Sequence, residues 1–454
     1  MVDKRSKYSA SVRDKPTTAR SVQDNFATEF LKYSEEYNVD PLPKIIIKSI
    51  ADFHVASVED DESPIFYLTY EKKKLDAVKE IESKGREVSI CILDALNSTM
   101  QKFNTITVLE LPDCKINAFG IVLIAEMLMT IGCVQDLNLD MNPNPQENFH
   151  LLCAPGGNLW YLSLNLCKIS DDGVKRIMNE LKYQDAPNEP KLSILNLANN
   201  HITKDGALHI GSMLRTNRSL KCLVLLGNRI CDEGASMILQ KLKITALTHE
   251  EIMDNRRRNF AELTLLDQLM EKEKDEETDK SIYEEQSRKS SKSRIRHSLT
   301  RRSKRLHPGS LVKIGDDESL YQASEPTRRK EIIYGSNKCH PFQNESFPIN
   351  GNIFATGNLE LQYLDLSYNY LSKTTLPEFI ECLYYQNYML GKDKTKGLLH
   401  VLLEGKGIER ENNPDWVTFQ ELLQLRQEGK SFTEDTFREF VPEEAEILRK
   451  NIKH

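Results

Sequence analysis

The residues best suited to chemistry in this sequence lie in two short stretches that resemble catalytic motifs. Glu-Gly-Lys-Ser at 428–431 matches the end of a phosphate-binding loop, whose backbone N–H groups would cradle a nucleotide. That motif requires a glycine where Gln424 stands, and no strand is predicted before it, so the match fails. The stretch His-Glu-Glu-Ile-Met, which begins at His249, lacks the second histidine of a zinc-protease helix. Neither stretch predicts an active site.

The cysteines also argue against catalysis or metal binding. They are Cys91, Cys114, Cys133, Cys153, Cys167, Cys222, Cys231, Cys339 and Cys382. Their number is odd, there is no Cys-x-x-Cys pair, and they lie in apolar surroundings, which is typical of reduced thiols in a cytosolic protein. Cys339 and His340 are adjacent but have no companion pair at ligand spacing. We therefore expect a protein that is not an enzyme and uses no cofactor or metal.

The strongest pattern in the chain is a repeat, Leu-x-x-Leu-x-Leu-x-x-Asn-x-Leu. One clear copy has Leu192, Leu195, Leu197, Asn200 and Ile202 at the defining positions. Other copies begin at Ile106, Val134, Leu159, Leu220 and Leu361, and a degenerate copy begins at Leu398. Internal repeats of this length predict a solenoid, because each unit can bury its apolar face only against its neighbours.

The spacing predicts one strand and one helix per unit. In Leu-x-Leu, alternate side chains of a short strand point into the core and outward. The asparagine ends the strand by bonding backbone groups of neighbouring coils, and Cys114 and Cys167 occupy this position in two copies. Acidic residues such as Asp171 and Asp232 then precede apolar residues at helical spacing. A nucleophilic role for either cysteine would need an added base.

These residues form the signature of leucine-rich repeats. Equivalent leucines are 28 residues apart, from Leu109 to Leu137 and from Leu195 to Leu223. With a full helix in each unit, this length resembles the ribonuclease-inhibitor subclass, over about residues 88–243 and 352–410. The resemblance implies an α/β horseshoe solenoid, here interrupted by a long, partly disordered insert. The second copy departs from the pattern, since residues 141–158 contain prolines and glycines where a helix would stand, so its helix is expected to be short or missing.

The residues that flank the core leucines are expected to line the concave face and to bind a protein partner. The predicted contact residues are Glu110, Asp136, Asn138, Asp140, Tyr161, Asn165, Asn196, Val224, Leu226, Tyr363 and Asp365. This face begins acidic and ends apolar, and Trp160, Tyr161 and Tyr363 are of the residue types that anchor interfaces. An equally good alternative is that the insert covers Cys222, Val224 and Leu226.

The regions outside the repeats divide the chain further. We expect a disordered arm at 1–44, an N-terminal cap at 45–103, repeats at 104–243, a charged insert at 244–351, further repeats at 352–410, and a C-terminal helical cap and tail at 411–454. Trp416, Phe419 and Leu422 are expected to cap the last repeat, and the end of the tail is expected to be loose. No apolar run is long enough for a bilayer span.

The insert has two parts with different compositions. Its first part is a helix with Met253, Phe260, Leu263, Leu266 and Met270 near one face, expected to fold back on the solenoid; the alternative is a helix presented to a partner groove. Its second part, residues 287–307, is basic and expected to be a disordered linker. The alternative is a docking segment for an acidic surface such as tubulin, through Arg288, Lys289, Lys292, Arg294, Arg296, Arg301, Arg302, Lys304 and Arg305.

Together these features predict a scaffold that binds another protein through its concave face. The net charge of −7 does not favour nucleic acid. The resemblance implies a cytoplasmic protein, and relatives with large inserts suggest a cilium or flagellum. Two alternatives remain open, both from families that use the same repeat: a regulator of a small GTPase similar to Ran GTPase-activating proteins, and an actin-binding protein similar to tropomodulins.

Overall fold

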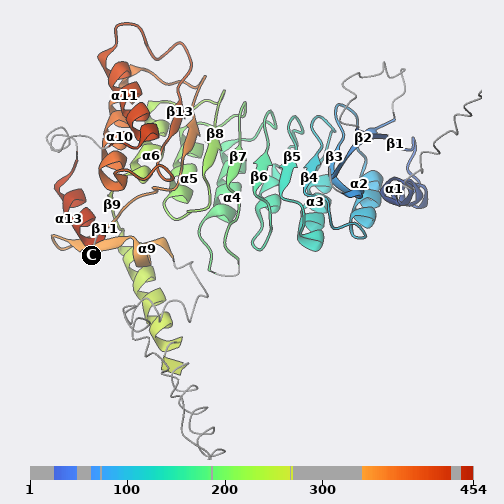
Figure 1. Cartoon of the computed structure of the whole chain (residues 1–454), viewed down its shortest axis with the longest axis horizontal. Helices are drawn as coiled ribbons and strands as arrows, with labels where there is room; N and C mark the ends of the chain where they lie inside the picture. The colour runs from blue at the N-terminus through green and yellow to red at the C-terminus, as the bar shows by residue number, and fades with distance from the viewer. Residues whose placement is uncertain are drawn as a thin grey trace, which may run out of the picture.

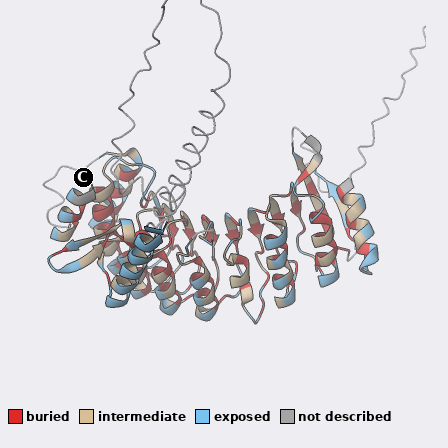
Figure 2. Cartoon of the chain, turned by 90° about the horizontal axis from the view of Figure 1, so that it is seen from below, coloured by how far each residue is buried: buried red, intermediate tan, exposed pale blue. Residues whose placement is uncertain are grey.

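The structure is a computed structural model that describes residues 25–48, 63–71, 74–185, 188–265, 267–268, 340–430 and 441–452. Its main feature is a ten-stranded sheet in the order β1-β2-β3-β4-β5-β6-β7-β8-β12-β13. The strands are β1 (Lys44–Ile47), β2 (Ile65–Glu71), β3 (Lys74–Glu82), β4 (Val108–Glu110), β5 (Asp136–Asn138), β6 (Tyr161–Ser163), β7 (Ile194–Asn196), β8 (Cys222–Val224), β12 (Tyr363–Asp365) and β13 (His400–Leu402). From β3 onward every neighbouring pair is parallel. The strands line one side of an elongated body and the helices line the other (Figure 1 and Figure 2).

From β3 onward, the chain crosses the opposite side as a helix between successive strands of this sheet. The helices are α1 (Asn25–Glu36), α2 (Ile90–Met100), α3 (Ala118–Ile131), η1 (Asn148–Cys153), α4 (Asp171–Leu181), α5 (Lys204–Leu214), α6 (Asp232–Leu239), η2 (Gln240–Leu242), α9 (Pro341–Asn344), η4 (Lys373–Thr375), α10 (Leu376–Leu390), α11 (Pro414–Glu428) and α13 (Glu443–Ile452). One strand plus one helix per repeat confirms the expected solenoid. The 3-10 helix η1 replaces the helix of the second copy, which confirms that its prolines and glycines shorten it.

The asparagine position joins consecutive coils through buried hydrogen bonds. Asn200 is 3% exposed; its Oδ1 accepts from Ile169 N at 2.9 Å, and its Nδ2 donates to Leu164 O at 2.9 Å and Leu197 O at 3.0 Å. Equivalent bonds are made by Asn142, Asn228 and Asn369. One side chain thus satisfies backbone groups of two coils that would otherwise be buried without partners.

Cysteine serves the same position with fewer bonds. The Cys114 thiol donates to Ser83 O at 3.2 Å, and the Cys167 thiol donates to Leu139 O at 3.3 Å. Each sulfur therefore reaches back to the preceding coil. Burial raises the pKa of both thiols to about 12, so they are protonated at neutral pH and are not nucleophiles.

A second set of contacts starts each helix. The Asp171 carboxylate accepts from Thr203 N at 2.8 Å, Thr203 Oγ1 at 2.6 Å and Gly206 N at 2.9 Å, so it caps the next helix, α5. A Cβ at Gly206 would lie 2.5 Å from the Asp171 carboxylate, so this close approach requires glycine. Glu147 and Asp232 make the equivalent contacts to Ser170 and Ser372.

The N-terminal cap is larger than expected. Residues 1–44 were expected to be disordered, but α1 is a helix that buries Phe26 and Phe30, which are 2% and 0% exposed. The Phe30 ring packs edge-on against Phe66 at 5.1 Å, and the Phe26 ring packs against Phe103 at 5.4 Å. The spacing of the two phenylalanines places them on one helical face, which the average composition of the segment conceals. Residues 1–24 lie outside the described residues.

The sheet is continuous across the insert. Strands β8 and β12 pair directly, with Cys222 opposite Tyr363, and Leu225 N donates to Asp365 O at 2.8 Å. The insert leaves through β9 (Thr245–Ala246) and returns through β10 (Ser346–Ile349) and β11 (Asn352–Ala355), which form a separate three-stranded sheet. Because β9 pairs with β11, the two ends of the insert lie side by side. The repeats therefore stack as if the insert were absent.

The C-terminal segment covers the last repeats. Phe419 and Leu422 are each 1% exposed, and the Phe419 ring packs against Phe379 at 5.8 Å, as expected for a cap. The end of the tail, expected to be loose, instead forms α13, whose Ala445 and Leu448 are fully buried. The Arg449 guanidinium lies 4.4 Å from the centre of the Tyr388 ring.

The buried hydrogen bonds of the repeated asparagines, called here the asparagine ladder, lead to a prediction about stability. Asn200→Ala removes the hydrogen bonds to Ile169 N, Leu164 O and Leu197 O and leaves these backbone groups buried without partners. The free energy of unfolding is expected to fall by roughly 3 kcal/mol, measured by urea denaturation of the full chain. The neighbouring His201 is exposed, so His201→Ala is the matched control and is expected to change stability by less than about 0.5 kcal/mol. Equal effects of the two substitutions would contradict the ladder's role.

Candidate interaction surface

The strand register places the outward side chains in two rows. The first outward row is Glu80, Val108, Asp136, Tyr161, Ile194, Cys222, Tyr363 and His400. The second outward row is Glu82, Glu110, Asn138, Ser163, Asn196, Val224, Asp365 and Leu402. Because parallel strands keep equivalent residues side by side, the repeat places residues from distant parts of the sequence on one face.

Several predicted contact residues of the second row bond to their own chain. Asn138 Oδ1 accepts from Asp140 N at 3.0 Å, Asn196 Oδ1 accepts from Ala198 N at 3.0 Å, and Asp365 Oδ1 accepts from Ser367 N at 2.9 Å. In each coil this bond turns the chain at the end of the strand. Asp365 is only 5% exposed, so its role is structural.

Asp140 lies in a network that ties three coils together. Its carboxylate accepts from Ser163 Oγ at 2.5 Å and from Asn165 N at 2.8 Å. Asn196 donates to Ser163 Oγ at 2.9 Å, and Asn199 donates to Asn165 Oδ1 at 2.9 Å. The predicted residues Asp140, Asn165 and Asn196 are thus brought together, but largely to hold the rim of the solenoid.

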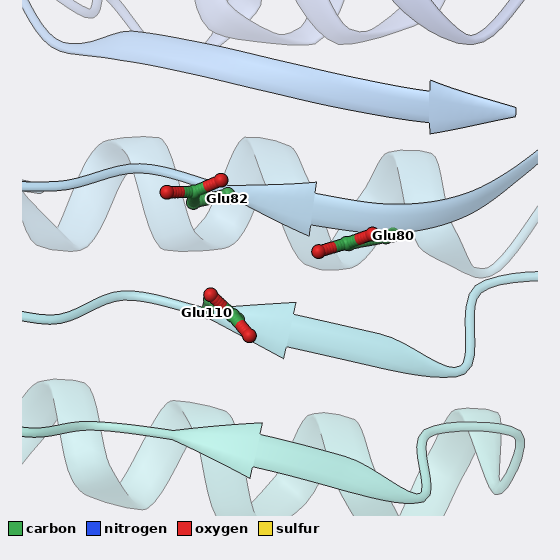
Figure 3. Close-up of side chains that lie close together, drawn as sticks. All are labelled: Glu80, Glu82 and Glu110. Atoms are coloured by element: carbon green, nitrogen blue, oxygen red, sulfur yellow. The ribbon is translucent and has the colours of Figure 1, made fainter. Parts of the chain in front are cut away.

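The N-terminal end of the face carries a carboxylate cluster, defined as Glu80, Glu82 and Glu110. Carboxylate oxygens of the three residues lie within 4.8 Å of one another, and Figure 3 shows them on adjacent strands β3 and β4. Glu82 forms an ion pair with Lys48. The repeat pattern predicts Glu110 at this face but not Glu80 and Glu82, because β3 lacks the repeat's leucines. The alternation Glu80-Ile81-Glu82 around a buried isoleucine was the available signal.

The charged form of Glu110 is disfavoured within this cluster. Burial, followed by the charges of Glu82 and Glu80, raises the pKa of Glu110. Burial also raises the pKa of Asp136, against the opposing effect of Lys79. Carboxylates are ligands for calcium and magnesium, but calcium takes six to eight oxygens and one of these three groups is already paired with lysine. The cluster is therefore best described as a negatively charged surface.

The other end of the face is apolar. Adjacent strands carry partly exposed apolar or aromatic side chains here, namely Tyr161, Ile194, Cys222, Val224 and Tyr363. Leu402, on the last strand, is 40% exposed. Leu226, at the rim beside them, is also partly exposed. Burial raises the pKa of the Cys222 thiol to about 11, so this cysteine contributes apolar surface and no thiolate at neutral pH. Trp160 is 50% exposed at the entrance to β6.

The described helix of the insert, residues 249–265, leaves this face uncovered. Glu251 pairs with Arg215, Asn255 donates to Phe342 O at 3.1 Å, and Arg258 pairs with Asp185 at 2.8 Å. Asp185 follows α4, Arg215 follows α5, and Phe342 belongs to α9. From these contacts the helix extends away from the body of the solenoid (Figure 1). The described part of this helix therefore does not cover Val224. The apolar side chains on this part of the strand face are not explained by contact with the described helix.

The predicted apolar face of that helix points outward. Phe260 and Leu263 are 73% and 58% exposed, and Met253 is 36% exposed. The prediction that this face packs on the solenoid is wrong, because the helix attaches through its other side. There Ile252 packs against an apolar cluster that includes Leu247 and Phe342, beside the polar contacts of the helix. The described residues do not include Leu266 or Met270. They also do not include any of the basic residues proposed for docking at 287–307.

A cavity of about 350 Å³ lies where the insert returns to the solenoid. It is lined by residues that include Tyr183, Arg218, Glu345 and Glu360. Arg218 pairs with Glu345 at 2.7 Å, and Glu360 pairs with Lys221 and Lys396. The Arg218–Glu345 pair fastens the insert to the solenoid, whereas the pairs of Glu360 with Lys221 and Lys396 join neighbouring repeats. These charged groups therefore fit a structural joint.

Comparison with known proteins supports the repeat assignment. Residues 158–178, 189–211 and 216–239 match the family model described as Leucine Rich repeat. The human protein "NACHT, LRR and PYD domains-containing protein 13" is 28% identical over 167 residues, which cover 30% of this chain and 16% of that protein. This chain thus spans about a sixth of the length of that relative. The chain carries leucine-rich repeats, and its sheet and helices form a leucine-rich repeat solenoid. Among the described helices, none is long and apolar enough to cross a membrane.

The carboxylate cluster makes a prediction about pH. A carboxyl whose pKa is raised by folding stabilises the folded state at pH below its unfolded value, and this stability is lost as pH rises through the folded value. Since the pKa of Glu110 is raised, Glu110→Gln is expected to increase the Tm at pH 7 and to leave it unchanged at about pH 4. Glu126→Gln, on the exposed side of α3, is the control and is expected to change neither value. A lower Tm for Glu110→Gln at pH 7 would contradict the proposed repulsion.

Proposed function

We propose that this chain is a non-enzymatic scaffold that binds a protein partner through the two outward rows of its strand face. One observation carries the proposal. The strands β6, β7, β8 and β12 are adjacent and present a continuous, partly exposed apolar surface made by Tyr161, Ile194, Cys222, Val224 and Tyr363. The described part of the insert lies elsewhere. Apolar and aromatic side chains held side by side on a rigid sheet are the usual anchors of a protein interface.

The rigidity of the sheet supports this proposal. Each strand is held by ladder hydrogen bonds, and the ends of the strands are closed by Asn138, Asn196 and Asp365. The face therefore loses little conformational entropy when a partner binds, which favours affinity. The thiols nearest the face are protonated, so a binding role fits its chemistry better than a nucleophilic one.

The proposal extends to cellular context on the strength of resemblance. The long interruption late in the repeat array resembles leucine-rich repeat-containing protein 71, and relatives of this kind suggest a cytoplasmic protein of the cilium or flagellum. The basic segment at 287–307 supports a second contact with an acidic surface such as tubulin. A small GTPase or actin as the bound partner would instead support the Ran GTPase-activating protein or tropomodulin alternative.

The test compares an apolar residue on each side of the solenoid. Val224 lies in the second outward row on β8, and Leu208, which is 47% exposed, lies on α5 on the helical side. Val224→Asp is expected to weaken binding of a partner purified from ciliated cells at least tenfold, about 1.4 kcal/mol, whereas Leu208→Asp leaves it unchanged. Binding is measured with the purified partner by isothermal titration calorimetry.

A second substitution guards against loss of folding. Tyr363→Ala removes an aromatic group from the same face without introducing a charge, and circular dichroism checks that each variant remains folded. The proposal is wrong if folded Val224→Asp and Tyr363→Ala proteins bind the partner as tightly as the unsubstituted chain. It is also wrong if Leu208→Asp alone abolishes binding.

A further inference from the structure

The two outward rows have different chemistry at the two ends of the array. At the N-terminal end, Glu80, Glu82 and Glu110 lie on β3 and β4, and Asp136 follows on β5. From β6 to β12 the partly exposed apolar and aromatic residues are Tyr161, Ile194, Cys222, Val224 and Tyr363, and Asn196 on β7 is a partly exposed polar residue among them. Consecutive strands thus present first a negatively charged zone and then an apolar zone.

Among the described residues, the carboxylates of the negatively charged zone outnumber the lysines that lie near them. Glu82 pairs with Lys48, whose side chain is 42% exposed, and Lys79 acts on Asp136 from a distance. Glu80 and Glu110 instead face each other and Glu82, with carboxylate oxygens within 4.8 Å. Like charges at this separation repel, and they are partly shielded from water. A cationic group placed among them would relieve this repulsion.

The apolar zone argues that the cationic group belongs to a larger partner. It begins on β6, the strand next to Asp136, so one continuous molecule would cover both zones. A metal ion fits the cluster poorly, since Glu82 is already paired with Lys48, and it would leave Tyr161, Val224 and Tyr363 in contact with water. An acidic partner would be repelled from one half of the surface. Lysine and arginine side chains satisfy both demands when aromatic or aliphatic side chains follow them in the same segment.

We propose that the partner presents a single segment with lysine or arginine residues at one end and aromatic or aliphatic residues at the other. The basic end lies over Glu80, Glu82 and Glu110, and the apolar end lies over Val224 and Tyr363. This inference rests on the proposed function and adds the chemistry and the direction of the bound segment. Charge complementarity fixes the direction, because reversing the segment would place its cations on the apolar strands.

The sheet sets the length of the segment. Six strand intervals separate β3 from β12 in the order β3-β4-β5-β6-β7-β8-β12. At about 4.8 Å per interval they span roughly 29 Å. A helix of about 19 residues or an extended segment of about nine residues covers this distance.

The test uses synthetic peptides and the full chain. The probe is a fluorescein-labelled peptide with alternating lysine and arginine, a short Gly-Ser spacer, and alternating leucine and tyrosine. Two comparison peptides replace the basic half by glutamate or the apolar half by Gly-Ser. Binding is measured by fluorescence anisotropy at low and at high salt.

Two triple variants each remove three negative charges, one from the strand face and the other from the helical side of the solenoid. The test variant is Glu80→Gln, Glu82→Gln and Glu110→Gln together. The control is Glu126→Gln, Glu233→Gln and Glu378→Gln together, which removes the same charge from exposed positions in α3 and α6 and a partly exposed position in α10. The test variant is expected to bind the basic-apolar peptide about tenfold more weakly at low salt, and the control to bind normally. The difference is expected to shrink at high salt, while Val224→Asp weakens binding at both salt concentrations.

Each outcome decides the inference. It is overturned if the basic-apolar peptide does not bind, if the glutamate peptide binds equally well, or if the two triple variants behave alike. Such a failure is distinguishable from failure of the proposed function, because Val224→Asp and Leu208→Asp are compared with the natural partner and not with these peptides. If the natural partner still requires Val224, the strand face is the binding surface and only its partner's charge has been misassigned.

Discussion

Buried backbone polarity is the constraint on which the rest of this structure depends. Each coil turns sharply after a three-residue strand, and the turn buries carbonyl and N–H groups that no strand or helix can satisfy. Asn142, Asn200 and Asn228 solve this problem because one amide both donates and accepts, reaching two coils at once. A thiol can only donate usefully here, so Cys114 and Cys167 maintain the link to the preceding coil alone. Stacking follows from these bonds, and the leucine core follows from the stacking.

The same constraint decides which residues remain available to a partner. Polar side chains near the turns, including Asp140, Asn196 and Asp365, are drawn into closing the strands. The outward side chains that do not bond to the turns remain available to a partner. They are carboxylates on β3 and β4, and apolar or aromatic groups from β6 onward. The insert does not disturb this division, because β9 and β11 bring its two ends together and β8 pairs directly with β12.

The sequence allowed the repeats and the outward residues of β4 to β8 and β12 to be predicted, because leucine spacing alone determines which side of a strand each residue faces. It did not reveal Glu80 and Glu82, because β3 lacks the repeat's leucines. It did not reveal α1, since Phe26 and Phe30 lie in a segment whose overall composition is polar. It also placed Phe260 and Leu263 against the solenoid, whereas the helix attaches through Arg258, Asn255 and Glu251. Periodicity shows that a helix has an apolar face but does not show what that face meets. Asp365 was counted as a contact residue because its burial depends on a neighbouring turn that spacing does not encode.

The most direct test of the account is a hydroxyl-radical footprint of the full chain with and without its purified partner, read residue by residue by mass spectrometry. We expect the partner to protect Tyr161, Val224 and Tyr363 on the strand face. We expect Phe119 and Leu208, which are 73% and 47% exposed on the helical side, to remain fully reactive. Protection of Phe260 and Leu263 on the insert helix, with no change at Tyr161 or Tyr363, would contradict it.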